Sequence, residues 1–176
     1  MNPVILSRGL WQGEKMGTTV DRLFLDFSIA KLNQFTTRIT DCLGRLKEDQ
    51  IWARGSENEN AIGNLVLHLC GNLRQWIISA IGGAPDTRIR DREFAARGGT
   101  SPSELADGIR TTVAEAVGIL DGLSAGRLCD PLRIQARDTT VLEAVYHVVE
   151  HFAQHTGQII YATKVATGAD LGPVNE

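Results

Sequence analysis

Hydrophobic residues recur every three or four positions along four long stretches of this sequence, and that spacing constrains the fold more than any other feature. A segment with this period gathers its apolar residues on one face when it is helical. The expected helices span residues 18–46, 60–81, 101–120 and 140–168. The apolar face of the first is predicted to comprise Val20, Phe24, Phe27, Phe35, Ile39, Leu43 and Leu46. Because almost no strand signal accompanies the helices, the sequence predicts an all-α four-helix bundle.

Local signals mark where these helices begin and end. Ser101 and Glu104 form a capping-box pattern at the start of the third helix, with a proline at the first helical position between them. Thr140 and Glu143 repeat the capping-box pattern at the start of the fourth helix. The glycines at 82–83 favour the end of the second helix, because glycine readily adopts the left-handed cap conformation.

Long connecting loops are expected between the helices, over residues 47–59, 85–99 and 126–138. They exceed the roughly two to eight residues usual between bundle helices, and loops of such length often carry function. The arginines and acids of 85–99 predict a solvated loop rather than an anion-binding site. Trp52, within the first loop, is expected to pack against the bundle.

The composition bounds the class of protein. A chain of 176 residues has the size of one domain, and its 43% hydrophobic content is enough for one core. A net charge of −3 does not provide the basic face that nucleic-acid binding requires. No apolar run reaches the roughly 18 residues of a spanning helix, and residues 1–16 lack the apolar stretch of a signal peptide. We therefore expect no nucleic-acid partner and no membrane segment.

The cysteines point to a compartment. Cys42, Cys70 and Cys129 are scattered and odd in number, so they do not form a disulfide framework. Such usage suits a reducing environment, and a cytoplasmic location is expected. Cys70 is predicted to be a small buried hydrophobic residue rather than a nucleophile.

All four histidines of the chain fall on two of the predicted helices. His147, His151 and His155 are spaced by four residues in the last helix. Residues at this spacing have β-carbons about 5–6 Å apart, so two imidazoles can bind one ion through metal–nitrogen bonds of about 2.0–2.1 Å. A third ligand must come from another helix, and His68 is the remaining histidine.

His68, His151 and His155 are therefore the predicted ligands of one divalent metal ion. Three neutral imidazoles leave at least one coordination position open, which is typical of catalytic rather than structural sites. His147 lies a further turn along the same helix, about 40° round its axis, and is expected to support the site or pack beside it.

Two asparagines flank His68 by one turn on either side. Asn64 and Asn72 are expected to orient imidazoles or waters at the site through hydrogen bonds.

Competing interpretations of these residues are weaker. A lone histidine on a helix is more often a surface or core-edge residue than a ligand, and the joint placement of all four favours a metal. The H-E-x-x-H motif of zinc proteases has the same histidine spacing, but residues 152–154 lack its glutamate. The identity of the ion stays open, because imidazole binds zinc, copper, iron and nickel.

Two stretches of the sequence resemble a known superfamily. Residues 62–72 read I-G-N-L-V-L-H-L-C-G-N, and residues 151–159 read H-F-A-Q-H-T-G-Q-I. An N-x-x-x-H on the second helix joined to an H-x-x-x-H-x-G-Q-I on the last resembles the DinB/YfiT superfamily of metal-binding four-helix bundles. The resemblance implies a single DinB-like domain over residues 18–176. Residues 1–17 lie outside it as an N-terminal arm.

The resemblance also implies a site and its partners. The superfamily's three metal positions fall on His68, His151 and His155, with zinc or nickel as the typical ion. Gly157 and Gln158 match its conserved turn, where glycine would permit close helix packing. Members are often homodimers, and some are metal-dependent transferases or isomerases that use low-molecular-weight thiols. A small-molecule substrate, a low-molecular-weight thiol and a second copy of the chain are thus the expected partners.

Three functions remain open on the sequence. The first is a metal-dependent transferase or isomerase acting with a low-molecular-weight thiol, for example a thiol S-transferase. The second is metal-dependent hydrolysis, which needs a general base that the sequence does not identify. The third is a non-catalytic, stress-related bundle that binds a metal or a small molecule.

Overall fold

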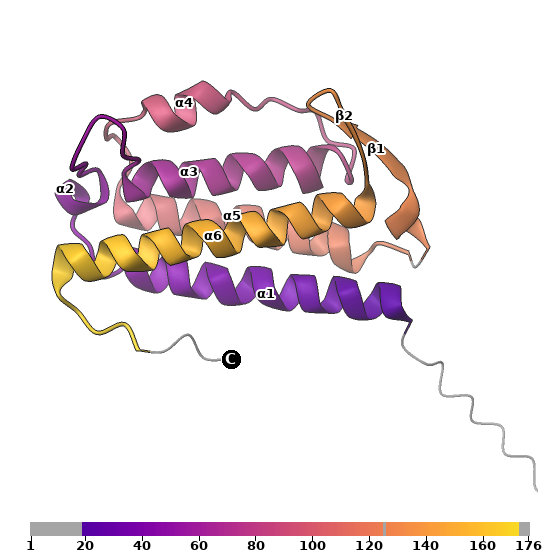
Figure 1. The fold of residues 1–176 in the computed structure, drawn as a ribbon, viewed down its shortest axis with the longest axis horizontal. Coiled ribbons are helices and arrows are strands. Elements are labelled where there is room, and N and C mark those ends of the chain that lie inside the picture. The colour runs from indigo at the N-terminus through magenta and orange to yellow at the C-terminus, as the bar shows by residue number, and fades with distance from the viewer. Residues whose placement is uncertain (1–18, 125, 173–176) are drawn as a thin grey trace, which may run out of the picture.

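The computed structural model describes residues 19–124 and 126–172. Its four long helices are α1 (Val20–Leu43), α3 (Ile62–Leu73), α5 (Pro102–Asp121) and α6 (Val141–Thr167) (Figure 1). Shorter elements connect them: α2 (Glu48–Ile51), α4 (Arg90–Ala95), the 3₁₀ turn η2 (Arg127–Cys129), and the strands β1 (Pro131–Ile134) and β2 (Arg137–Thr140). The predicted all-α bundle is confirmed.

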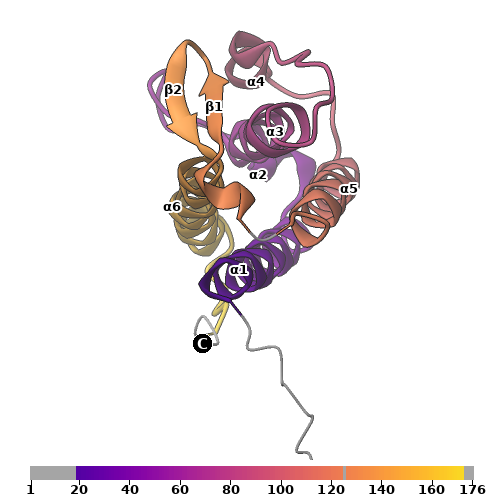
Figure 2. The same ribbon diagram turned by 90° about the vertical axis from the view of Figure 1, so that its right-hand side faces the viewer.

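The four long helices surround one core, and each contacts two of the others. α1 lies against α5 and α6, and α3 closes the bundle by contacting the same two helices from the other side (Figure 2). Fully buried side chains from all four fill the centre. They include Leu25, Leu32, Ile39, Leu69, Leu73, Ile109, Leu120, Phe152 and Ile159. This packing fixes the facing surfaces of α3 and α6, which carry all four histidines.

The predicted capping boxes are both present. The Ser101 hydroxyl accepts from the Glu104 backbone N–H at 3.3 Å, and Glu104 in turn accepts from the Ser101 N–H at 2.8 Å. Thr140 and Glu143 form the same pair of bonds at 3.3 and 2.8 Å. α5 and α6 therefore begin where the sequence predicts, because each box satisfies backbone donors at the helix start.

Two predicted elements differ from the structure. The second helix changes at residue 74 into a π-helical turn, η1 (Arg74–Ser79), which buries Trp76. The connector 126–138 contributes to an antiparallel hairpin of β1 and β2, although the sequence carries almost no strand signal. The hairpin turn has positive φ values at Gln135 (52°) and Ala136 (63°). Two-residue turns of this kind favour Gly, Asn or Asp, so neither residue type predicts this turn.

The apolar face predicted for α1 is also wrong in part. Val20 and Phe27 are 80% and 64% exposed, whereas Leu25 and Leu32 face the core. α1 thus carries two apolar stripes, and only one of them packs within the chain.

The long loops pack more closely than the sequence suggests. Trp52 is half-buried against the core and donates its indole N–H to the Thr100 carbonyl at 3.0 Å, as expected for a residue tucked against the bundle. Within residues 85–99, α4 lies along the outer side of α3 (Figure 1). Most side chains of this segment are exposed, as expected, but Glu93 is buried.

The N-terminal arm predicted for residues 1–17 lies outside the described residues. None of the described helices is both long and apolar enough to cross a membrane.

Candidate metal centre

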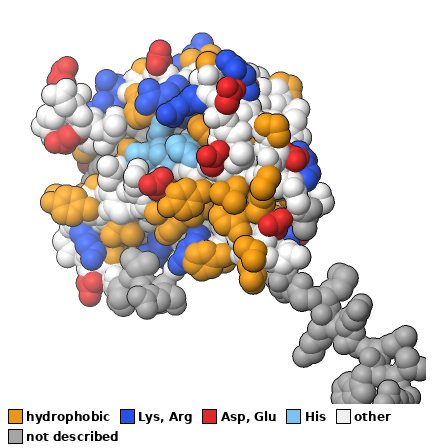
Figure 3. Space-filling view, turned by 45° about the vertical axis from the view of Figure 1, so that its right-hand side comes forward, with side chains coloured by type: hydrophobic (Ala, Val, Ile, Leu, Met, Phe, Trp, Pro, Cys, Tyr) orange, Lys and Arg blue, Asp and Glu red, His pale blue; other side chains and the backbone are white. Residues whose placement is uncertain are grey.

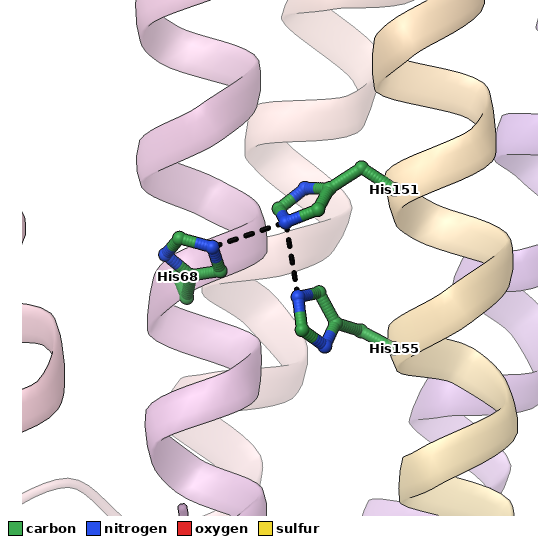
Figure 4. A group of neighbouring side chains, drawn as sticks. All are labelled: His68, His151 and His155. Atoms are coloured by element: carbon green, nitrogen blue, oxygen red, sulfur yellow. Dashed lines mark hydrogen bonds between the residues drawn. The ribbon is translucent and has the colours of Figure 1, made fainter.

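Three imidazole rings meet between α3 and α6. His68 projects from α3, and His151 and His155 project toward it from successive turns of α6 (Figure 4). The Nε2 atom of His151 lies 3.0 Å from Nε2 of His68 and 2.9 Å from Nε2 of His155. One nitrogen from each ring lies within 4.8 Å of the other two. A tetrahedral ion with bonds of about 2.0–2.1 Å separates its ligands by roughly 3.3–3.4 Å, so small ring movements suffice to hold one.

The proton on His155 is placed by a neighbour on the same helix. Its Nδ1 lies 2.6 Å from the side-chain oxygen of Gln158. An amide oxygen only accepts hydrogen bonds, so Nδ1 must donate. Nε2 is then left with its lone pair facing the other two rings. Gln158 stands in the sequence motif, but only the structure shows this contact.

The proton on His68 is placed by a carboxylate from α4. Its Nδ1 lies 2.8 Å from Oε2 of Glu93, which as a carboxylate accepts. Arg88 holds Glu93 with two hydrogen bonds, Nε to Oε1 at 2.8 Å and Nη2 to Oε2 at 2.9 Å. The side chains of Arg88 and Glu93 are only 4% and 10% exposed, so the prediction of a solvated loop is wrong for both.

Burial favours the neutral form of the two α6 histidines in the trio. Burial, followed by the positive charges of neighbouring histidines and Arg88, lowers the pKa of His151 to about 3. Burial also lowers the pKa of His155, against the hydrogen bond to Gln158. Burial acts to raise the pKa of Glu93, but hydrogen bonds from Arg88 and His68 outweigh it and the pKa falls. A divalent ion requires its histidine ligands to be neutral, and the lowered pKa values of His151 and His155 meet that requirement.

His147 lies beside the three converging rings rather than among them. Its ring is nearly parallel to that of His151, with centroids 5.6 Å apart, and lies 4.2 Å from the indole of Trp76. Its Nε2 is 3.4 Å from the amide nitrogen of Asn72. His147 thus packs between Trp76 and His151, and Asn72 contacts His147.

Asn64 acts on the backbone rather than on an imidazole. Its side-chain nitrogen donates to the carbonyls of Glu93 at 2.8 Å and Ala96 at 3.0 Å. Its oxygen accepts from the Ala61 N–H at 3.1 Å. These bonds tie α4 to the start of α3, and α4 brings Glu93 to His68.

Comparison with protein families decides what kind of protein this is. The model of a family described as "Protein of unknown function (DUF1572)" matches residues 19–173. The chain belongs to the DUF1572 family, with a DinB-like fold.

Solved DinB-like structures share this fold at low sequence identity. A DinB-like protein from Bacillus cereus superposes with a TM-score of 0.68 at 17% identity, covering 85% of this chain and 97% of that one. A DinB-like protein from Bacillus subtilis gives 0.65 at 13% identity, covering 85% and 99%. A mutant of the mycothiol-dependent maleylpyruvate isomerase gives 0.55 at 14% identity, and the match spans 83% of this chain and 61% of that one. No curated protein matches the chain.

Histidine side chains of this DinB-like chain reach the surface between basic side chains on one side and a hydrophobic area on the other (Figure 3). His151 and His155 are partly exposed, whereas His68 is buried. One turn beyond His155 and His68 a cavity of about 790 Å³ opens. Gln158 and Leu65 line it together with Ile62, Tyr161 and Val165. The cavity thus lies next to the candidate site, although none of the three converging histidines lines it.

Two further residues of the DinB-like motifs can now be placed. A Cβ added at Gly157 would meet no atom within 4 Å among the described residues, so the expected close helix packing there is wrong within one chain. Burial raises the pKa of the Cys70 thiol to about 11, so Cys70 is a thiol near neutral pH. That matches the expectation that it is not a nucleophile.

Proposed function

We propose that this protein binds one divalent metal ion through Nε2 of His68, His151 and His155, and acts with a low-molecular-weight thiol as a transferase or isomerase. The observation that carries the proposal is the convergence of three Nε2 atoms from two helices. Hydrogen bonds to Glu93 and Gln158 support it, because they leave two of these atoms with lone pairs facing the centre.

The donor set fits zinc or nickel. Three neutral imidazoles leave the charge of a divalent ion intact and leave at least one coordination position open. Bound there, such an ion supplies Lewis acidity that stabilises a thiolate at neutral pH. The chain's own groups hold the three rings in position, and histidine atoms at the surface in Figure 3 are within reach of a small thiol.

Two observations favour an external thiol. The bundle fold is shared with a protein described as a mycothiol-dependent isomerase. The cavity beside Gln158 offers about 790 Å³ for the body of a thiol or its co-substrate, with an apolar wall from α3 and α6. Cys70 does not replace such a thiol, because its pKa of about 11 keeps it protonated.

Hydrolysis ranks behind this proposal because it requires a free general base. Glu93 does not meet that requirement. Arg88 occupies both of its oxygens, and His68 shares one of them. Non-catalytic binding of a metal or a small molecule ranks third, since an open site beside a cavity favours turnover.

We further propose that the protein is a cytoplasmic homodimer. Exposed hydrophobic side chains of α1 and α6 gather at the end of the bundle where both helices begin: Leu23 and Phe27 on α1, and Leu142 and Tyr146 on α6. An apolar area of this kind, continuous in Figure 3, is typical of a protein–protein interface.

The experiment begins with untagged protein loaded with zinc or nickel and dialysed. Elemental analysis should give one ion per chain. The loaded protein is then incubated with a panel of bacterial thiols and an electrophile such as a chloro-dinitrobenzene. Thiol consumption above the metal-free control supports the enzyme, and its absence across the panel contradicts it. A full complement of metal without turnover would leave the binding bundle as the better account.

A further inference from the structure

We propose that Glu93 is a positioning residue, which holds the proton of His68 on Nδ1 and so aims the Nε2 lone pair at the metal position. The inference rests on the proposed metal function. It assigns a task to a carboxylate that lies on a different element from all three proposed ligands, and that no sequence motif identifies. Arg88 orients the Glu93 carboxylate, and Gly71 leaves the space in which that carboxylate lies.

The first observation is that three hydrogen bonds hold the Glu93 carboxylate. Its Oε1 accepts from Arg88 Nε, and its Oε2 accepts from both Arg88 Nη2 and His68 Nδ1, all within 2.9 Å. Arg88 Nη2 also lies 3.1 Å from His68 Nδ1. In the proposed tautomer both nitrogens carry protons, and both donate to the Glu93 carboxylate between them. A buried guanidinium that grips the carboxylate through two bonds sets its orientation, as paired Arg–carboxylate contacts do.

The second observation is the space through which Glu93 reaches α3. A Cβ added at Gly71 would lie 1.9 Å from Glu93 Oε1, 2.7 Å from its Cδ and 3.0 Å from Arg88 Nε. Gly71 stands three residues after His68, on nearly the same face of α3. Only glycine at this position lets the ion pair lie against the helix beside the ring that it orients.

The third observation is that the backbone of α4 is fixed from the same helix. The Asn64 side chain donates to the carbonyls of Glu93 and Ala96. The ring of Phe94 lies 4.7 Å from the ring of His68, centroid to centroid. α3 therefore supplies the histidine, the glycine and the asparagine, and the segment 88–96 supplies the groups that hold the ring.

The chemistry of such an arrangement is general. A histidine that donates its second N–H to a carboxylate is a fixed and more basic ligand, and loss of the carboxylate typically costs 10–100-fold in metal affinity. Glu93 does not reach the converging nitrogens, so its effect passes through His68.

The first test uses the unaltered, metal-free protein. Long-range ¹H–¹⁵N NMR of the imidazoles, with His68 assigned by its loss in His68→Gln, reports which nitrogen carries the proton. The inference predicts the Nδ1–H form for His68, and a dominant Nε2–H form would overturn it. Because no metal is involved, this result stands apart from the fate of the proposed function.

The second test displaces Glu93 without changing its chemistry. Gly71→Ala should weaken zinc binding about 10- to 100-fold in a chelator competition, and Glu93→Gln should do the same. Gly108→Ala is the matched control, because a Cβ there meets nothing within 4 Å and the residue is also helical. Equal zinc affinity in Gly71→Ala and Gly108→Ala would overturn the inference. Wild-type protein that binds no zinc would instead contradict the proposed function.

Discussion

The candidate site can hold an ion only if the three imidazoles present nitrogen lone pairs to it. His68 and His155 donate from Nδ1 to oxygens, so both present lone pairs at Nε2. His151 lies between them, and its buried Nδ1 has no hydrogen-bond partner among the described residues. In the metal-free protein His151 therefore carries its proton on Nε2 and donates it toward the Nε2 lone pairs of His68 and His155. A bound ion would take the place of that proton between the lone pairs.

The ligand trio predicts a graded response to truncation. His151→Ala should weaken zinc affinity roughly 100-fold or more, since each protein ligand supplies a large share of the binding energy. His147→Ala should cost about tenfold or less, because its ring stacks beside the trio. Isothermal titration calorimetry measures both. Equal losses would show that the trio is wrongly assigned.

Gln158 predicts a smaller effect on the same measurement. Gln158→Leu removes the acceptor for the Nδ1–H of His155, so zinc affinity should fall by about tenfold. The side chain is exposed, so the melting temperature of the metal-free protein should change little. Gln154→Leu, on an exposed position of the same helix, is the control, and a loss of equal size there would contradict the assigned contact.

At the level of elements, capping boxes and helical periodicity were enough to predict the long helices, but not the contact between α4 and α3 beside the histidines. The capping boxes and the helical period depend on neighbours in sequence, so the starts of α5 and α6 could be predicted. The burial of Glu93 depends on a contact between α4 and α3, and no local pattern carries that information. Gly71, one turn from His68, leaves the space for that contact, but its role is visible only in the structure.

The start of α6 predicts a separable effect on stability. Thr140→Ala removes the hydroxyl that accepts from the Glu143 N–H and should lower the free energy of unfolding by about 0.5–2 kcal/mol. Urea denaturation measures this loss. Zinc stoichiometry should stay at one ion per chain, because the cap lies nearly three turns from His151. A loss of zinc binding without a loss of stability would contradict the prediction that the cap stabilises the helix and leaves the metal site unchanged.

For the whole molecule, four helices bring distant segments together and leave one apolar face uncovered. Two residues of the stripe that the sequence assigned to the core, Val20 and Phe27, proved to be exposed, because helical period alone does not distinguish a core from an interface. The dimer proposal accounts for both stripes of α1. The metal-free site also makes the whole fold sensitive to acid.

The exposed face predicts the oligomeric state. Light scattering should give twice the chain mass of 19.2 kDa for the wild type. Phe27→Glu with Tyr146→Glu should yield a folded monomer, because charge placed within an apolar interface is costly. Ile89→Glu, an exposed hydrophobic position on the α4 side, should remain dimeric. A monomeric wild type would exclude the dimer.

The lowered histidine pKa predicts how the stability of the metal-free protein depends on pH. The pKa of His151 is 6.5 in the unfolded chain and about 3 in the folded one. The unfolded state therefore binds protons first as pH falls. Stability should be full above pH 6.5 and should decline progressively toward pH 3, as thermal unfolding across that range would show. His151→Gln should decline less steeply, and an unchanged slope would contradict the assignment.

The central claim is that one ion joins His68 on α3 to His151 and His155 on α6. A crystal structure of the zinc-loaded protein, with anomalous scattering recorded at the zinc edge, tests it most directly. The account predicts one peak about 2.0–2.1 Å from Nε2 of each of these three residues. A peak bound by other groups, or three rings without zinc in fully loaded crystals, would contradict it.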